Sequence, residues 1–280
     1  MEKRNLMKKR LTLKITLLIT IVLIIGSCTF LLASHKIVVV NGELKLSTAE
    51  SFEIHDTNIT DKDLRNLKYF SDIQQLNLST PQIKDISFVS EMKELKTLSI
   101  ESQNIINLNL LNNCPELETL NLYHTNLTDL DFLVCNVNLK VLDIYTGNPV
   151  QDISGLQQLQ KLEHFSVSSS EIKDISPIGS LSNLTLLEMT CDSIKDVSPL
   201  AKCQKLKFLN LSGCEQITDI SSLKELDSLE EINISGTAVS NFSPLLSMKN
   251  LKKVIVQNGQ IDSSMCSELK EKNITVDLIK

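Results

Sequence analysis

The stretch LNLSGCEQITDISSLKEL, residues 209–226, gathers side chains that can bind metals or take part in catalysis. It contains the thiol of Cys214, the carboxylates of Glu215 and Asp219, and the amide of Asn210. Thiolates, carboxylates and amide carbonyls are the ligands of zinc and calcium sites, and an activated thiol can serve as a nucleophile. The spacing of these residues along the chain decides between such a site and a structural role.

The stretch is one copy of a pattern that recurs along the chain. The pattern is LxxLxL followed by xx(N/T)xIxDIxxLxxLxx, and successive copies begin 22 or 23 residues apart. Their first apolar residues are Ile73, Leu95, Leu117, Leu139, Leu162, Leu184, Leu206, Leu229 and Leu251. A degenerate copy precedes them from Ala49, and a shortened one follows from Asn273. This period indicates a solenoid, in which each unit buries its apolar row against its neighbours.

Each unit has a strand half and a helical half. Positions 4 and 6, such as Leu209 and Leu211, alternate with polar residues as in a half-buried strand. The return half spaces its apolar residues three or four apart, which suits a short helical turn. Ser176, Ser198 and Ser243 are expected N-caps, each followed by a proline at the first helical position. The expected fold is an α/β solenoid with a parallel sheet on its concave face and short helical or 3₁₀ segments on its convex face.

The run LEHFSVSSSEIKDISPIGSLSNLTLLEMTCDSIKDVSPLAKCQKL resembles the 22-residue leucine-rich repeats of bacterial internalin-type proteins, whose signature is IxDIxPLxxLxxL after LxxLxL. The resemblance covers about residues 49–280 and implies a leucine-rich repeat solenoid. Internalin-type proteins typically add an Ig-like domain and a wall-sorting signal after the repeats. Neither is seen before Lys280, which weakens the expectation of host-cell adhesion.

The repeat explains the opening cluster without a metal. Asp219 shares its position in the unit with Asp85, Asn107, Asp129, Asp152, Asp174, Asp196 and Asn241. Side chains of this type hydrogen-bond the backbone of a turn. They would stand in single file about 4.8 Å apart, whereas calcium needs six to eight oxygens around one point. We therefore predict no metal and no cofactor, and we place Cys214 in the turn position of Thr125, Ser170 and Thr237.

The remaining cysteines fit the same pattern. Cys114 and Cys203 stand three residues before the next unit and are expected to be buried, with Cys135 filling the equivalent space in an irregular unit. Cys266 lies in a predicted helix after Asp262, its expected N-cap. An odd total of seven, with no CxxC spacing, argues against a disulfide framework.

The N-terminus predicts a membrane anchor. Residues 1–14 carry six Lys or Arg and one Glu, and residues 15–34 carry no charge. Twenty helical residues can cross a hydrocarbon core of about 30 Å, and the basic flank should stay in the cytoplasm. The expected protein is single-pass in the cell membrane, with its repeats extracytoplasmic. Two alternatives remain, namely secretion after cleavage near Ala33 and lipidation at Cys28.

Residues 35–280 are acidic, with 22 Lys and Arg against 33 Asp and Glu, a net charge of −11. This excess argues against nucleic acid as the main partner. Residues 35–48 are expected to form an N-terminal cap or hairpin turning at Asn41-Gly42, and residues 49–280 the solenoid.

A ligand is expected on the concave face, where positions 3, 5 and 7 of each unit point. In the central units these positions combine aromatic, apolar and acidic side chains, which are typical of interfaces. The candidate ligand-binding residues are Tyr123, His124, Val141, Asp143, Tyr145, His164, Leu186, Glu188 and Phe208. We predict a protein ligand. The alternatives are a scaffold or regulatory subunit of a membrane complex and a carbohydrate-binding module.

Catalysis is not expected. His164 and Asp143 stand on adjacent strands and could hydrogen-bond, but Cys191, the available nucleophile, would lie about 16 Å away along the strands at about 3.3 Å per residue. The chain also lacks GxSxG, HExxH and a glycine-rich phosphate loop.

Overall fold

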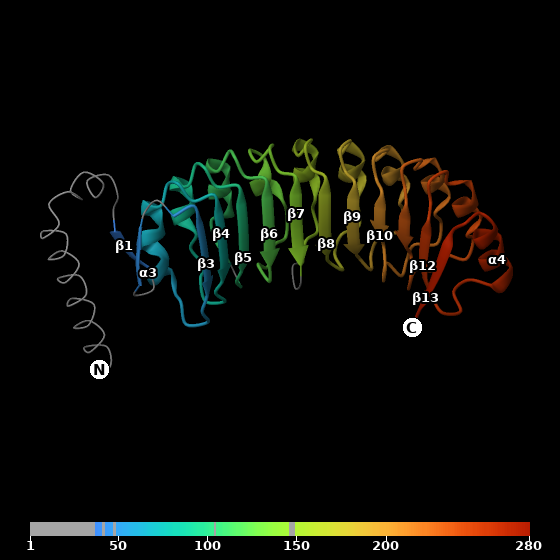
Figure 1. Ribbon diagram of the computed structural model, residues 1–280, viewed down its shortest axis with the longest axis horizontal. Helices are drawn as coiled ribbons and strands as arrows, with labels where there is room; N and C mark the ends of the chain where they lie inside the picture. Colours follow the sequence, from blue (N-terminus) through green and yellow to red (C-terminus); the bar gives the residue numbers. More distant parts are fainter. Residues whose placement is uncertain (1–36, 41–42, 47–48, 104, 146–148) are drawn as a thin grey trace, which may run out of the picture.

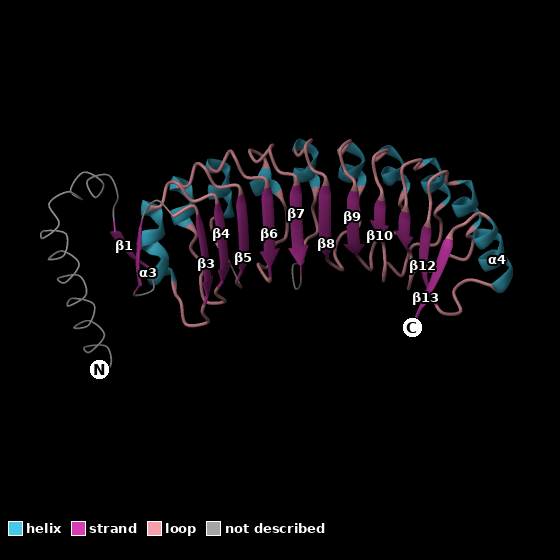
Figure 2. Cartoon of the chain, viewed as in Figure 1, coloured by secondary structure: helices cyan, strands magenta, loops and turns pink. Residues whose placement is uncertain are grey.

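The computed structural model describes residues 37–40, 43–46, 49–103, 105–145 and 149–280. From β3 onward the chain is an arc of stacked repeats, and the strands form one continuous sheet (Figure 1). The short helical segments follow the outer rim of the arc, opposite the sheet (Figure 2). The expected α/β solenoid is therefore confirmed.

The sheet contains eleven parallel strands in sequence order. They are β3 (Ser51–His55), β4 (Gln75–Ser79), β5 (Thr97–Glu101), β6 (Thr119–Tyr123), β7 (Val141–Tyr145), β8 (His164–Ser168), β9 (Leu186–Thr190), β10 (Phe208–Asn210), β11 (Glu231–Asn233), β12 (Lys253–Gln257) and β13 (Thr275–Ile279). Equivalent positions of neighbouring units pair directly, as Tyr123 does with Tyr145. The repeat therefore arranges equivalent side chains in rows across the sheet.

The return segments are mostly single 3₁₀ turns. They are η1 (Arg65–Tyr69), η2 (Ser87–Glu91), η3 (Leu108–Asn113), η4 (Asp131–Leu133), η5 (Ser154–Gln158), η6 (Ser176–Ser180), η7 (Ser198–Lys202), η8 (Ser221–Glu225) and η9 (Ser243–Ser247). Among the described residues, two α-helices stand near the ends of the solenoid, α3 (Asp61–Leu64) and α4 (Ser263–Glu271). Asp262 caps α4 as expected, because its Oδ1 accepts from the Met265 N–H at 2.8 Å.

The core lies between the sheet and these turns. Positions 1, 4 and 6 of the units are buried throughout, as Leu206, Leu209 and Leu211 illustrate. Burying one such leucine contributes about 1.5–3 kcal/mol. No unit can bury its row alone, so the stability of the arc is shared between neighbouring units.

Aspartates cap the 3₁₀ turns. Asp174 Oδ1 accepts from the Ser176 N–H at 2.8 Å, and Asp196 and Asp219 make the same bond to Ser198 and Ser221. These backbone donors hold the pKa of Asp196 below its usual range. Asn107 differs, because it has a left-handed φ of 61° and its Oδ1 accepts from Ile86 of the preceding unit.

The predicted serine caps are wrong by one position. Ser176, Ser198 and Ser243 are the first residues of η6, η7 and η9, and the following prolines are the second. The residue two before each serine caps the turn through an Asx hydrogen bond, so the serine is free to enter the helical segment.

Two predictions about small side chains need correction. Cys135 is exposed, and Asn136 fills the space next to Cys114, donating to the Leu111 and Cys114 carbonyls at 2.9 and 3.3 Å. Ser170 is exposed as well, while its neighbour Ser169 is buried and donates to the Val150 carbonyl at 2.8 Å. The irregular units shift the register by one residue, and the averaged pattern does not show this.

Cys114 and Cys203 are buried, as predicted. Cys191 and Cys214 are buried as well, and Cys266 on α4 is half-buried. Burial raises the pKa of the Cys114 and Cys203 thiols to about 11. These side chains act as small apolar residues of the core.

Ahead of the solenoid, β1 (Ile37–Val40) and β2 (Glu43–Leu46) pair antiparallel with Val40 opposite Glu43, and β1 lies against η1. The turn at residues 41–42, the basic segment 1–14, the predicted anchor 15–34 and the alternatives at Cys28 and Ala33 lie outside the described residues. Within the part of the chain that the structure describes, no helix is long and apolar enough to span a membrane.

Candidate ligand-binding site on the concave sheet

An apolar and aromatic row crosses the centre of the sheet. Val141, His164, Leu186 and Phe208 pair in register from β7 to β10. The first three are half-buried, and Phe208 is 43% exposed. They stand side by side because each occupies position 3 of its unit. An unbroken row of this kind is more informative than one exposed apolar residue.

Tyr123 and Tyr145 form a second feature at the ends of β6 and β7. Their rings are stacked, with centroids 5.7 Å apart and planes 19° from parallel. Both side chains are half-buried, so one edge of the stack faces solvent. His124 lies just beyond β6, exposed and with a left-handed φ of 56°, and its N–H donates to the Tyr145 carbonyl at 3.3 Å.

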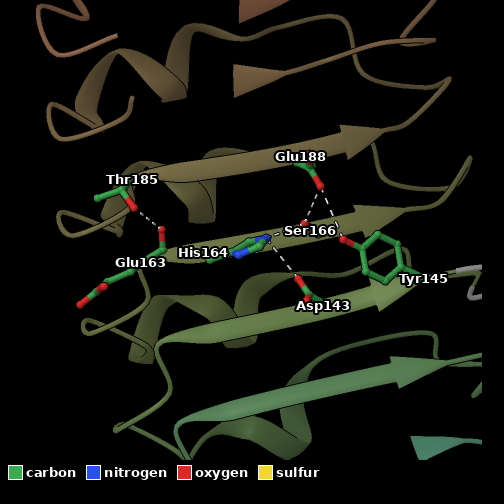
Figure 3. A network of polar contacts seen from close by, with 7 residues as sticks. All are labelled: Asp143, Tyr145, Glu163, His164, Ser166, Thr185 and Glu188. Atoms are coloured by element: carbon green, nitrogen blue, oxygen red, sulfur yellow. Dashed lines mark hydrogen bonds and ion pairs between the residues drawn. The ribbon is translucent and has the colours of Figure 1, made fainter. Parts of the chain in front are cut away.

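A polar network joins the row to the stack (Figure 3). His164 Nε2 lies 3.3 Å from Asp143 Oδ1 and 2.9 Å from Ser166 Oγ. Ser166 Oγ donates to Glu188 Oε2 at 3.2 Å, and the Tyr145 hydroxyl donates to the same oxygen at 3.5 Å. The expected proximity of His164 and Asp143 is therefore present, as an ion pair when the imidazole is protonated, and three strands contribute to the network.

Ser166 is the residue that the sequence interpretation missed. It is 0% exposed at the centre of β8 and contacts both His164 and Glu188. Position 5 of the unit holds a serine there, between Asp143 and Glu188 on the flanking strands. A complete reading of that row across units would have identified it.

The network has an unusual charge balance. Burial raises the pKa of Asp143, and the charge of Glu188 adds to this, whereas the charge of His164 and the neighbouring Ser166 hydroxyl lower it. Apart from the 3.3 Å contact with His164 Nε2, the buried Asp143 Oδ1 has no hydrogen-bond partner among the described residues. Burial, followed by the charge of Asp143, also raises the pKa of Tyr123. The centre of the face is therefore negative and only partly compensated.

A shallow hollow lies beside the network. It has a volume of about 200 Å³ and is lined by residues that include Leu186, Glu188, Phe208, Asn210 and Glu231. Asn210 bends the chain there, because its Oδ1 accepts from the Ser212 N–H at 3.0 Å. β10 is accordingly only three residues long. The hollow combines apolar walls with two carboxylates.

The geometry offers binding groups more readily than catalytic ones. Cys191 is fully buried, and burial raises the pKa of its thiol to about 12, so it is protonated at neutral pH. Cys214 and Asp219, which open the question of a metal site, are a core residue and a turn cap. Within the described residues, no group of three or more His, Cys, Asp or Glu is arranged to hold a metal ion.

Comparison with known proteins first finds leucine-rich repeats in the central units. A family model described as Leucine Rich repeats (2 copies) matches residues 115–158 and 182–225, in the central units. No curated protein matches the chain significantly.

Solved bacterial structures then show the same fold. An internalin (inlF) from Listeria monocytogenes is 21% identical, with a TM-score of 0.60 and coverage of 85% of this chain and 86% of that one. Internalin C2 from the same species is 23% identical, with a TM-score of 0.56 and coverage of 77% and 85%. A leucine-rich repeat protein from Leptospira interrogans is 15% identical, with a TM-score of 0.54 and coverage of 76% and 68%. The predicted resemblance to internalin-type proteins is confirmed in the fold.

Proposed function

We propose that this chain is a non-enzymatic binding protein whose concave sheet receives a protein ligand. One observation carries the proposal, namely the continuous surface formed by the tyrosine stack, His164, Leu186 and Phe208. Aromatic and apolar side chains at the centre of a surface, bordered by polar ones, are the usual composition of a protein interface. The similarity to internalins supports the fold. The ligand is inferred from the residues of this surface.

The proposed roles follow from exposure and charge. Phe208 and Leu186 are the apolar anchors, since they line an open hollow. Tyr145 adds a flat ring whose position is fixed by stacking on Tyr123, so little side-chain entropy is lost on binding. Asp143 and Glu188 orient the ligand through their charges.

We further propose that residues 15–34 anchor the protein in the cell membrane and that the repeats are extracytoplasmic. Support comes from the uncharged stretch and its basic flank. Lipidation at Cys28 and secretion are the competing forms, and each leaves the repeats outside the cytoplasm. The function proposed for the sheet does not depend on which form occurs.

The test is a pull-down from cell-surface and culture extracts with the full-length chain. Tyr145→Ala combined with Phe208→Glu should abolish capture of a partner, because both positions lie on the binding face. The matched control is Val134→Glu, which adds the same charge at a residue 50% exposed after η4. Circular dichroism must show that both variants are folded.

The outcomes separate the hypotheses. Loss of capture in the concave variant alone supports the proposal. Equal capture by both variants would mean that the interface lies on another surface, and would favour the scaffold or regulatory subunit. Capture of polysaccharide in place of protein, with protection of the two tyrosines from chemical modification, would favour a carbohydrate-binding module.

A further inference from the structure

The charges on the concave face are of one sign. Strands β4 to β11 contain four carboxylates and no lysine or arginine. The carboxylates are Glu101, Asp143, Glu188 and Glu231. Lys253 of β12 lies 3.5 Å from Glu231 and 3.3 Å from Asp277, so it neutralises the far end of the face. Glu101, Asp143 and Glu188 remain without a lysine or arginine partner among the described residues.

The lysines of the central units lie outside strands β6 to β10. Two of them stand at position 2 of their units, where Lys140 pairs with Glu118 at 3.0 Å and Lys207 with Glu230 at 4.0 Å. Position 2 and position 7 are five residues apart, a distance of about 16 Å along a strand. These lysines therefore do not screen the tyrosine stack, which is beyond a Debye length of about 8 Å.

The three central carboxylates surround the stacked rings. Glu101 pairs in register with Tyr123, and Glu188 accepts from the Tyr145 hydroxyl. Asp143 lies two residues before Tyr145 on the same face of β7, and apart from His164 its Oδ1 has no hydrogen-bond partner among the described residues. The faces of aromatic rings attract cations, and nearby carboxylates strengthen that attraction. His164 is the one group within the network that can carry a positive charge.

We propose that the protein ligand inserts an arginine side chain at the Tyr123–Tyr145 stack, between Glu101 on one side and Asp143 and Glu188 on the other. The inference rests on the proposed function and names the chemistry of its partner. An arginine matches the site better than a lysine because its planar guanidinium packs against rings and donates in a fork to carboxylates.

The test uses the full-length chain in detergent micelles with ¹³C-labelled tyrosine. The probe is the peptide acetyl-Gly-Arg-Gly-amide, and the neutral control is acetyl-Gly-Gln-Gly-amide. The chain has three tyrosines, and Tyr69 serves as an internal reference because Lys68 already lies over its ring at 5.2 Å. The arginine peptide should shift the ring signals of Tyr123 and Tyr145 and leave Tyr69 unchanged, whereas the glutamine peptide should shift none of them.

Matched variants separate the site from general acidity. Asp143→Asn with Glu188→Gln should weaken binding of the arginine peptide by about fivefold, or about 1 kcal/mol. Glu116→Gln with Glu171→Gln removes the same charge at exposed positions off the strands and should leave the affinity unchanged. If the first double variant is unfolded, the comparison of the two peptides on the native chain still tests whether the site prefers arginine to a neutral side chain.

Two results would overturn the inference, namely equal shifts with both peptides or equal weakening in both double variants. The pull-down then separates failure of the arginine proposal from failure of the concave interface. Capture that still depends on Tyr145 and Phe208 would keep the concave interface and reject only the arginine. Capture that does not depend on them would reject both.

Discussion

At the scale of single residues, Asp143 shows how a residue of the proposed binding face can oppose stability. Its charged form is unfavourable in the folded protein, because burial raises its pKa despite the contact with His164. A residue that served only the fold would have no reason to retain this cost, whereas binding sites often do. That Oδ1 has no hydrogen-bond partner besides His164 among the described residues agrees with that interpretation.

We predict that Asp143→Asn increases the free energy of unfolding at pH 7, by up to about 1 kcal/mol. The raised pKa means that the folded state binds the proton of Asp143 more tightly than the unfolded state does. The stabilisation from proton binding at Asp143 is therefore fully present below the pKa of this carboxyl in the unfolded state. It is lost as the pH rises through the pKa of the carboxyl in the folded state. Urea unfolding at pH 7 and pH 3 should show the variant's advantage at pH 7 and its disappearance at pH 3. A variant less stable than the native chain at pH 7 would contradict this.

At the scale of elements, the Asx turns should contribute measurably to the free energy of unfolding. Asp196→Ala removes the acceptor of the Ser198 N–H and should cost about 0.5–1 kcal/mol, as for other lost caps. Asp196→Asn should restore most of it, because Asn241 makes the same bond to Ser243 in another unit.

The pH dependence of this effect has the opposite sign to that of Asp143. The pKa of Asp196 is lowered in the fold, so its contribution is present above the unfolded value of 3.8 and is lost as the pH falls through the folded pKa. Thermal unfolding of the native chain and the alanine variant should therefore converge in acid. A constant difference at all pH values would mean that the hydrogen bond is not the cause.

The two faces of one strand provide a second prediction at this scale. Leu187 is fully buried, and Leu187→Ala should cost about 2–5 kcal/mol by leaving a cavity. Leu186 precedes it on the solvent-facing side of β9, and Leu186→Ala should cost less than about 1 kcal/mol. Chemical denaturation of both variants tests the register, and equal losses would contradict the assignment of faces.

The elements also show what the sequence could predict. A period of 22 or 23 residues defines which side chains share a row, so the sheet, its face and the pairing of Tyr123 with Tyr145 followed directly. Offsets of one residue could not be predicted from the period. For example, Asn136 fills the buried space that the pattern assigned to Cys135. Such offsets depend on where a particular turn places its hydrogen bonds. Ser166 was missed because its importance arises from neighbours 22 or 23 residues away.

At the scale of the whole molecule, the charges divide the chain. Residues 1–34 carry six Lys and Arg against one Glu, and the remainder carries a net charge of −11. A basic flank beside an uncharged stretch is retained in the cytoplasm, whereas an acidic domain after it can be exported. The proposed orientation would present the concave face to partners outside the cell.

The exposed thiol of Cys135 provides a natural test of that orientation. A membrane-impermeant maleimide should modify Cys135 in intact spheroplasts of a bacterial host expressing the full chain, as shown by mass spectrometry of the peptide that contains it. Cys203 should react only after denaturation, because it is buried and its thiol pKa is raised to about 11, so it reports that the repeats were folded during labelling. Cys135→Ser provides the blank. Modification of Cys135 only after lysis would place the repeats in the cytoplasm and contradict the proposed anchor orientation.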